Sequence, residues 1–123
     1  MVYANLTPIF SSVMEIRMGS PYHFAELELA GKWVPELPDY DWQDLFAESP
    51  NGRYLVLVAW MIDENHPGFR FVVIDKKEKV VRESKRITGC CQSLNWHVGL
   101  SYETAGHFRE KEIKTWKTIA EEI

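Results

Sequence analysis

The sequence has few cysteines, and their placement excludes a disulfide framework. Its 123 residues include only two, Cys90 and Cys91, which are adjacent. Neighbouring cysteines close no chain loop, so they cannot stabilise a small secreted domain. The Cys-x-x-Cys spacing of structural zinc sites is absent, and His97 and His107 lie too far apart for a zinc finger. We therefore expect no metal site and no cofactor.

The sequence also shows no signal-peptide pattern and no long apolar run. No Lys or Arg precedes Arg17, and no apolar segment near the N-terminus has the length that a signal peptide requires. The longest apolar run covers residues 54–62, about half the length that a helix needs to cross a bilayer. These features predict a cytoplasmic protein with no membrane partner.

An excess of positive charge is missing as well. The 14 Lys and Arg residues stand against 18 Asp and Glu residues, a net charge of −4. This balance argues against a nucleic-acid binder that relies on neutralising phosphates.

With 46% hydrophobic and 13% aromatic residues, the chain is too apolar to be disordered. Its length suits one globular domain, so we expect a single β-rich domain over residues 1–123.

What the sequence does contain is a series of short strand patterns. Residues 22–29 alternate apolar and polar side chains, as a strand with one wetted face does. Residues 54–62 are apolar on both faces and predict a central strand covered on both sides, and residues 69–75 predict a second one. An Asn51-Gly52 turn, which suits a hairpin, directly precedes the pattern over residues 54–62.

The remaining strand patterns are shorter. They cover residues 13–18, 80–87, 93–96 and 100–108, with a linker over 88–91. Residues 109–123 fit either a helix or a strand, and their Thr content favours a strand as far as about Thr118. The sum is a mainly β fold with little helix: an antiparallel meander or sandwich of seven to eight short strands, or a partly open barrel.

Part of this pattern resembles a β-propeller blade. The residues Ser49-Pro50-Asn51-Gly52-Arg53-Tyr54-Leu55 resemble the turn and strand that open such a blade. Residues 71–75 are similar to its second strand, and Leu94-Asn95-Trp96 to the start of the next blade. A closed propeller needs at least four blades, and residues 48–102 hold two at most. The resemblance therefore implies an antiparallel meander and carries no propeller function.

One segment, residues 35–50, accounts for the negative charge of the chain. It carries five acids and no Lys or Arg, and without those acids 14 basic residues face 13 acidic ones. Aromatic side chains lie among the acids, a combination that suits a basic protein partner because aromatics anchor and carboxylates steer. We predict a partner-binding site in this acidic segment, formed by Glu36, Asp39, Tyr40, Asp41, Trp42, Asp44 and Glu48.

The alternative interpretation of the acidic segment is structural. It would be a solvated loop or short helix whose aromatic side chains turn inward onto the sheet. A calcium-binding EF-hand loop is excluded, because Asp44 stands where that loop requires glycine and Pro50 where it requires glutamate.

A second charged segment, residues 76–86, is basic. Its positive residues are Lys76, Lys77, Lys79, Arg82, Lys85 and Arg86, against Glu78 and Glu83. No aromatic residues lie among them, so a solvated hairpin is favoured over a single-strand nucleic-acid platform. This basic hairpin could also face the acidic segment of a second copy of the chain.

These observations leave three hypotheses about function. The first is a non-enzymatic protein-interaction module that binds a basic partner, similar in general character to small bacterial immunity or inhibitor proteins. The second is a small-ligand-binding or hydrolytic β-domain with a pocket formed by His97, Glu103, His107 and Cys90 or Cys91. The third is a structural domain that associates with itself. No motif identifies a catalytic residue.

Overall fold

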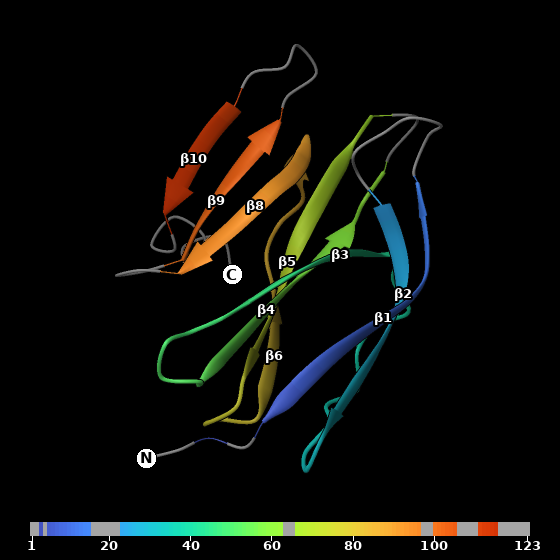
Figure 1. The fold of residues 1–123 in the computed structure, drawn as a ribbon. Helices are drawn as coiled ribbons and strands as arrows, with labels where there is room; N and C mark the ends of the chain where they lie inside the picture. The colour runs from blue at the N-terminus through green and yellow to red at the C-terminus, as the bar shows by residue number, and fades with distance from the viewer. Residues whose placement is uncertain are drawn as a thin grey trace.

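The computed structural model describes residues 5–15, 23–62, 66–96, 100–105 and 111–115, together with Tyr3. These residues form strands and no helix (Figure 1). The strands are β1 (Leu6–Glu15), β2 (His23–Gly31), β3 (Trp42–Glu48), β4 (Tyr54–Trp60), β5 (Gly68–Asp75), β6 (Val80–Glu83), β7 (Ile87–Thr88), β8 (Cys90–Trp96), β9 (Leu100–Ala105) and β10 (Lys111–Thr115). The predicted mainly β fold is confirmed, with ten strands where seven or eight were expected.

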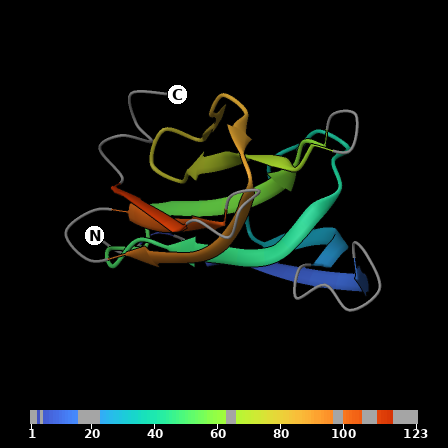
Figure 2. The ribbon, with the colours of Figure 1, turned by 90° about the horizontal axis from the view of Figure 1, so that it is seen from above.

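The strands form an antiparallel meander and a smaller sheet. In the meander, β1 to β6 pair in sequence order, and β7 pairs with β5 beyond the end of β6. Seen from above, the β1–β2 hairpin and β6 lie at opposite ends of the meander (Figure 2). Among the described strands these two ends do not pair, so the sheet is not closed into a barrel. The smaller sheet has the order β10–β9–β8.

The core lies on both faces of β4 and β5. Because successive side chains of a strand point to opposite faces, their continuous apolar sequence fills two clusters. One contains Val56, Val58, Phe69, Phe71, Val73 and Cys91, and the other contains Leu6, Leu29, Trp42, Leu55, Leu57, Ala59, Val72 and Ile74. The prediction that residues 54–62 and 69–75 form central strands covered on both sides is confirmed for β4 and β5.

The predicted turn between β3 and β4 is also confirmed. The Ser49 hydroxyl donates to the side-chain oxygen of Asn51 at 2.8 Å and accepts from the backbone N–H of Tyr54 at 2.9 Å. The Asn51 side chain also accepts from the backbone N–H of Arg53 at 3.0 Å. Gly52 has a φ of 78°, a conformation that glycine adopts without steric cost. Local residue chemistry therefore sets this hairpin.

The structure corrects the prediction of a loop or short helix for part of the acidic segment, because residues 35–41 are irregular but the residues that follow form a strand. Residues 42–48 form strand β3, whose register with β4 shifts between Trp42 and Phe46. Three residues of β3 there lie opposite one residue of β4, so consecutive side chains such as Trp42 and Gln43 are both buried. This bulge removes the strict alternation by which a strand is recognised in a sequence.

Several other strand boundaries differ from the prediction. The first strand begins at Leu6 instead of residue 13, and its register shifts between Ser11 and Met14. The predicted strand over residues 80–87 is split into β6 and β7, and β8 begins inside the expected linker at Cys90. β10 confirms the strand preferred over a helix for residues 109–118, where the structure describes them.

Asp75 holds the end of β5 and supplies a prediction about pH. Both of its carboxylate oxygens accept from the Arg53 guanidinium at 2.9 Å, and Oδ1 also accepts from the backbone N–H groups of Lys77 and Glu78. The ion-paired hydrogen bonds with Arg53, aided by the two backbone N–H groups, lower the pKa of Asp75 below its ordinary value of 3.8.

A carboxyl group whose pKa is lowered on folding stabilises the fold above its unfolded pKa, and this contribution is lost as pH falls through the folded pKa. We therefore expect Asp75→Asn to be less stable than the wild type at pH 7. The difference should shrink as pH falls below 3.8. Urea unfolding at a series of pH values measures it, and a difference independent of pH would contradict this role of Asp75.

Candidate functional site

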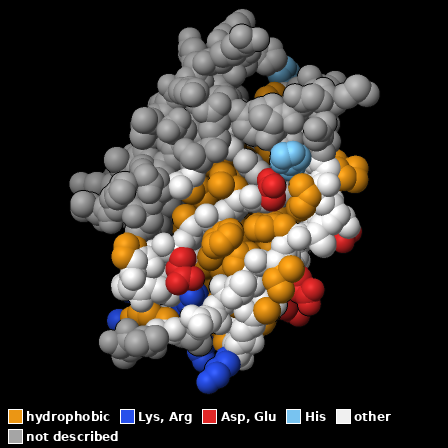
Figure 3. All heavy atoms as spheres, viewed as in Figure 1, with side chains coloured by type: hydrophobic (Ala, Val, Ile, Leu, Met, Phe, Trp, Pro, Cys, Tyr) orange, Lys and Arg blue, Asp and Glu red, His pale blue; other side chains and the backbone are white. Residues whose placement is uncertain are grey.

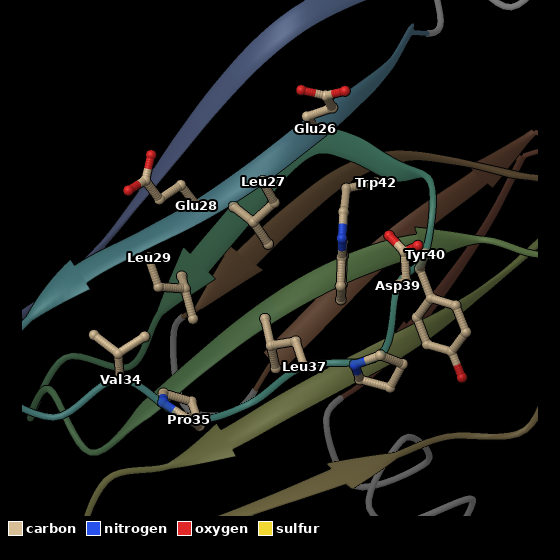
Figure 4. Close-up of a pocket in the computed structure, with 11 residues that line it drawn as sticks. Glu26, Leu27, Glu28, Leu29, Val34, Pro35, Leu37, Asp39, Tyr40 and Trp42 are labelled. Carbon is tan, nitrogen blue, oxygen red and sulfur yellow. The ribbon is translucent and has the colours of Figure 1, made fainter.

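An open groove of about 640 Å³ lies between β2 and the chain segment over residues 34–42. Its floor is formed by apolar side chains that are buried or half-buried, namely Leu27, Leu29, Pro35, Leu37 and Trp42, and the exposed Val34 and Pro38 also line it. Three acids, Glu26, Glu28 and Asp39, line it as well, together with Tyr40. In Figure 4, Leu27, Leu29, Leu37 and Trp42 point toward one another, whereas Glu26 and Glu28 project away from the floor. We call this feature the acid-rimmed groove.

The sequence of β2 builds one wall of the groove. Its side chains alternate, so Leu27 and Leu29 point to the floor while Glu26 and Glu28 are exposed. After Gly31 the chain turns and crosses the same face of the sheet as the segment over residues 34–41, which forms the other wall. The two walls are therefore adjacent in sequence, and a single connection forms the groove.

The structure places the predicted partner-binding residues in two groups. Asp39, Tyr40 and Trp42 line the groove. Glu36 and Asp41 are exposed on the same segment but are not among its lining residues. Asp44 and Glu48 are exposed on β3, where each has a partner within the chain. The Asp44 carboxylate lies 3.6 Å from Nδ1 of His23, and that of Glu48 lies 3.3 Å from Nζ of Lys76.

Trp42 corrects the prediction of an exposed aromatic anchor. It is 4% exposed, because its position on β3 opposite Ala59 directs the indole into the core cluster that contains Leu29 and Leu57. The inward orientation weighed as the alternative is thus the correct one for Trp42. Its role at the site is to form part of the groove floor.

Tyr40 joins the acidic segment to β5 and β6. Its hydroxyl donates to Oε1 of Glu83 at 2.6 Å, and Nη1 of Arg70 lies 3.4 Å from the same oxygen. The ring of Tyr40 contacts the Trp42 ring edge-on, with centroids 5.7 Å apart, and lies under the Arg70 guanidinium. These contacts fix the position of Tyr40 in the wall of the groove.

The hydrogen bond to Glu83 raises the pKa of Tyr40 above 10.0, because ionisation of the phenol would end the bond and place two negative charges together. We expect Glu83→Gln to lower the pKa of Tyr40 toward its ordinary value. NMR titration of protein labelled with ¹³C at the tyrosine Cζ measures this shift, with Tyr40→Phe assigning the resonance. An unchanged Tyr40 titration in E83Q would contradict the contact.

The basic hairpin is partly engaged within the chain. The ammonium group of Lys76 is buried and pairs with Glu48 of the acidic segment. The Arg86 guanidinium donates to the backbone carbonyls of Met61 and His66 at 2.8 and 2.9 Å. Exposed positions remain at Lys77, Lys79, Arg82 and Lys85. Figure 3 shows Lys and Arg side chains at the lower end of the face drawn there, away from most of its acids.

The predicted His, Cys and Glu pocket falls largely outside the described residues. His97 and His107 lie outside the described residues, and of Glu103 only the backbone is described. Cys91 is fully buried and Cys90 half-buried. In the part of the chain that the structure describes, no three His, Cys, Asp or Glu residues are grouped as a metal site would need. Nor do those residues include a helix long and apolar enough to cross a membrane.

Sequence reasoning missed the contribution of β2 to the site. The alternation that exposes Glu26 and Glu28 was visible, but nothing in it shows that β2 faces residues 34–42. Comparison with protein-family models, curated proteins and solved structures found no match for this chain.

Proposed function

We propose that this protein is a non-enzymatic interaction module that binds a basic segment of a protein partner in the acid-rimmed groove. The observation that carries the proposal is the combination of an apolar floor with exposed acids beside it, Asp39 on one wall and Glu26 and Glu28 on the outward face of β2. A small immunity or inhibitor protein is one class that would use such a surface, by covering a basic face of its target.

The floor supplies the contact area for this binding. Each Leu- or Val-sized side chain that a partner buries there contributes about 1.5–3 kcal/mol before the costs of association. A volume of about 640 Å³ is within the range of pockets that enclose a ligand, and it fits several side chains of a chain segment. The groove therefore suits a short segment better than a flat protein surface.

The rim supplies the preference for positive charge. None of the described residues that line the groove is Lys or Arg, and Glu36 and Asp41 add exposed carboxylates on the same segment. Exposed carboxylates keep most of their hydration, so they steer and select a basic partner more than they raise its affinity. Binding should consequently weaken as salt screens the charges.

Two acetylated, amidated heptapeptides test the proposal, Lys-Val-Lys-Leu-Lys-Val-Lys and its counterpart with Glu in place of every Lys. Fluorescence polarisation of labelled peptides should show saturable binding of the lysine peptide, weaker at high salt, and none of the glutamate peptide. Equal binding of both peptides, or no saturable binding of the lysine peptide below about 1 mM, would overturn the proposal. Sedimentation of the protein at low salt provides the control, because it measures the oligomeric state. A dimer that does not bind the peptide would show that a second copy of the chain occupies the groove, which would overturn the proposal.

A further inference from the structure

One edge of β2 is open where it borders the groove. Along its other edge β2 pairs with β1 from the Leu6–Gly31 pair to the Glu15–His23 pair. On the groove side it pairs with β3 at a single position, Ala25 with Trp42. From Glu26 to Gly31, no described strand pairs with this edge.

The open edge and the groove coincide. Residues 26–29 of β2 line the groove, and the opposite wall is the segment over residues 34–42. Successive backbone N–H and C=O groups of a strand point alternately to its two edges, so about half of those between Glu26 and Gly31 point toward the groove. A strand placed beside β2 would pair with these groups.

The opposite wall is unsuited to pairing with β2 itself. Pro35 and Pro38 have no backbone N–H, and the N–H of Tyr40 is used by the carbonyl of Pro38 at 2.9 Å. Proline within a segment prevents a regular ladder of hydrogen bonds. The segment over residues 34–42 therefore runs beside β2 without forming a ladder of hydrogen bonds with its open edge.

The outer edge of the neighbouring strand β1 is less suited to pairing. The outer edge of β1 carries Pro8, and its register shifts at Ser12, which has a φ of 51°. A proline and a bulge are the devices by which edge strands avoid pairing with another chain. The edge of β2 from Glu26 to Gly31 contains neither.

We infer that the basic segment binds as an added β-strand along the open edge of β2; this deepens the proposed function and rests on it. Side chains of the added strand alternate between the two faces of the sheet. Those beside Leu27 and Leu29 enter the apolar floor, and those beside Glu26 and Glu28 lie within reach of the carboxylates. The partner chemistry is therefore an extended segment in which basic and apolar residues alternate.

N-methylated forms of the lysine heptapeptide test this mode of binding. All Lys amides of an extended peptide point to one edge, and the Val and Leu amides point to the other. One derivative carries N-methyl groups on the inner Lys residues, and the other carries them on the Val and Leu residues. We expect one derivative to bind at least tenfold more weakly than the parent peptide and the other to stay within about threefold of it.

The outcomes separate the two proposals. If the parent peptide fails to bind, the proposed function fails. A strand added at β2 uses only one edge of the peptide, so the two derivatives should differ in affinity. If the parent peptide binds and both derivatives bind equally, whether strongly or weakly, the inference of an added strand is wrong and the proposed function stands. Hydrogen exchange gives a second readout: alternate amides between Glu26 and Ala30 should exchange more slowly in the complex. Unchanged exchange there would also overturn the inference.

Discussion

Replacing Phe71 by alanine is expected to lower the free energy of unfolding by about 3–5 kcal/mol, the usual loss for a fully buried phenylalanine. Phe71 is fully buried on β5, where it lies opposite Val58 and contacts the Phe69 ring edge-on at a centroid distance of 5.4 Å. A domain of this size is stable by about 5–15 kcal/mol, so the variant should be close to unfolding at physiological temperature. Urea and thermal unfolding measure the loss.

Phe46→Ala is the matched control, because it removes the same atoms from a phenylalanine that is 46% exposed. The Phe46 ring lies 6.3 Å from that of Phe10 at the surface, so its loss should cost about 1 kcal/mol or less. Equal losses in the two variants would contradict the placement of the core on β4 and β5.

Glu28→Lys is expected to weaken binding of the lysine heptapeptide by about tenfold or more at low salt, which corresponds to about 1.4 kcal/mol. Glu28 is exposed on the rim of the groove, and the substitution would place a positive charge beside the lysines of the bound peptide. Fluorescence polarisation over a salt series measures the effect, which should diminish as salt rises.

Glu78→Lys provides the matched control for this prediction. Glu78 is equally an exposed glutamate, but it lies in the basic hairpin, and the same change shifts the net charge of −4 by the same amount. It should leave peptide affinity within about twofold. A similar loss in both variants would show that the peptide responds to overall charge and not to the groove.

The sequence predicted the central strands because their signals are local. In β4 and β5 nearly every residue is apolar, and β-branched and aromatic side chains dominate, so no neighbouring element is needed to recognise them. The turn around Asn51-Gly52 is local in the same way, since the side chains of Ser49 and Asn51 organise it.

The strands that were missed or misplaced contain irregularities. In β3 the register shift between Trp42 and Phe46 puts consecutive side chains into the interior, so the acidic segment resembles a loop in sequence. In β1 the shift between Ser11 and Met14 interrupts the alternation in the same manner. A bulge is set by pairing with the neighbouring strand, and the sequence of one strand does not reveal it.

The candidate site was predicted in part for a related reason. The local concentration of acids identified the segment that contributes Asp39 and Tyr40 to the groove. The burial of Trp42 and the approach of Glu26 and Glu28 depend on how the β1–β2 hairpin lies relative to β4, which is a tertiary property. Charge patterning located one wall, and only the fold located the other.

Mapping the lysine heptapeptide on the protein by backbone amide NMR tests the central claim most directly. The account predicts that the largest chemical-shift changes fall on residues 26–29 and 34–42, the two walls of the acid-rimmed groove. Changes confined to β3 around Asp44 and Glu48, or to the exposed surface around Phe46, would contradict it.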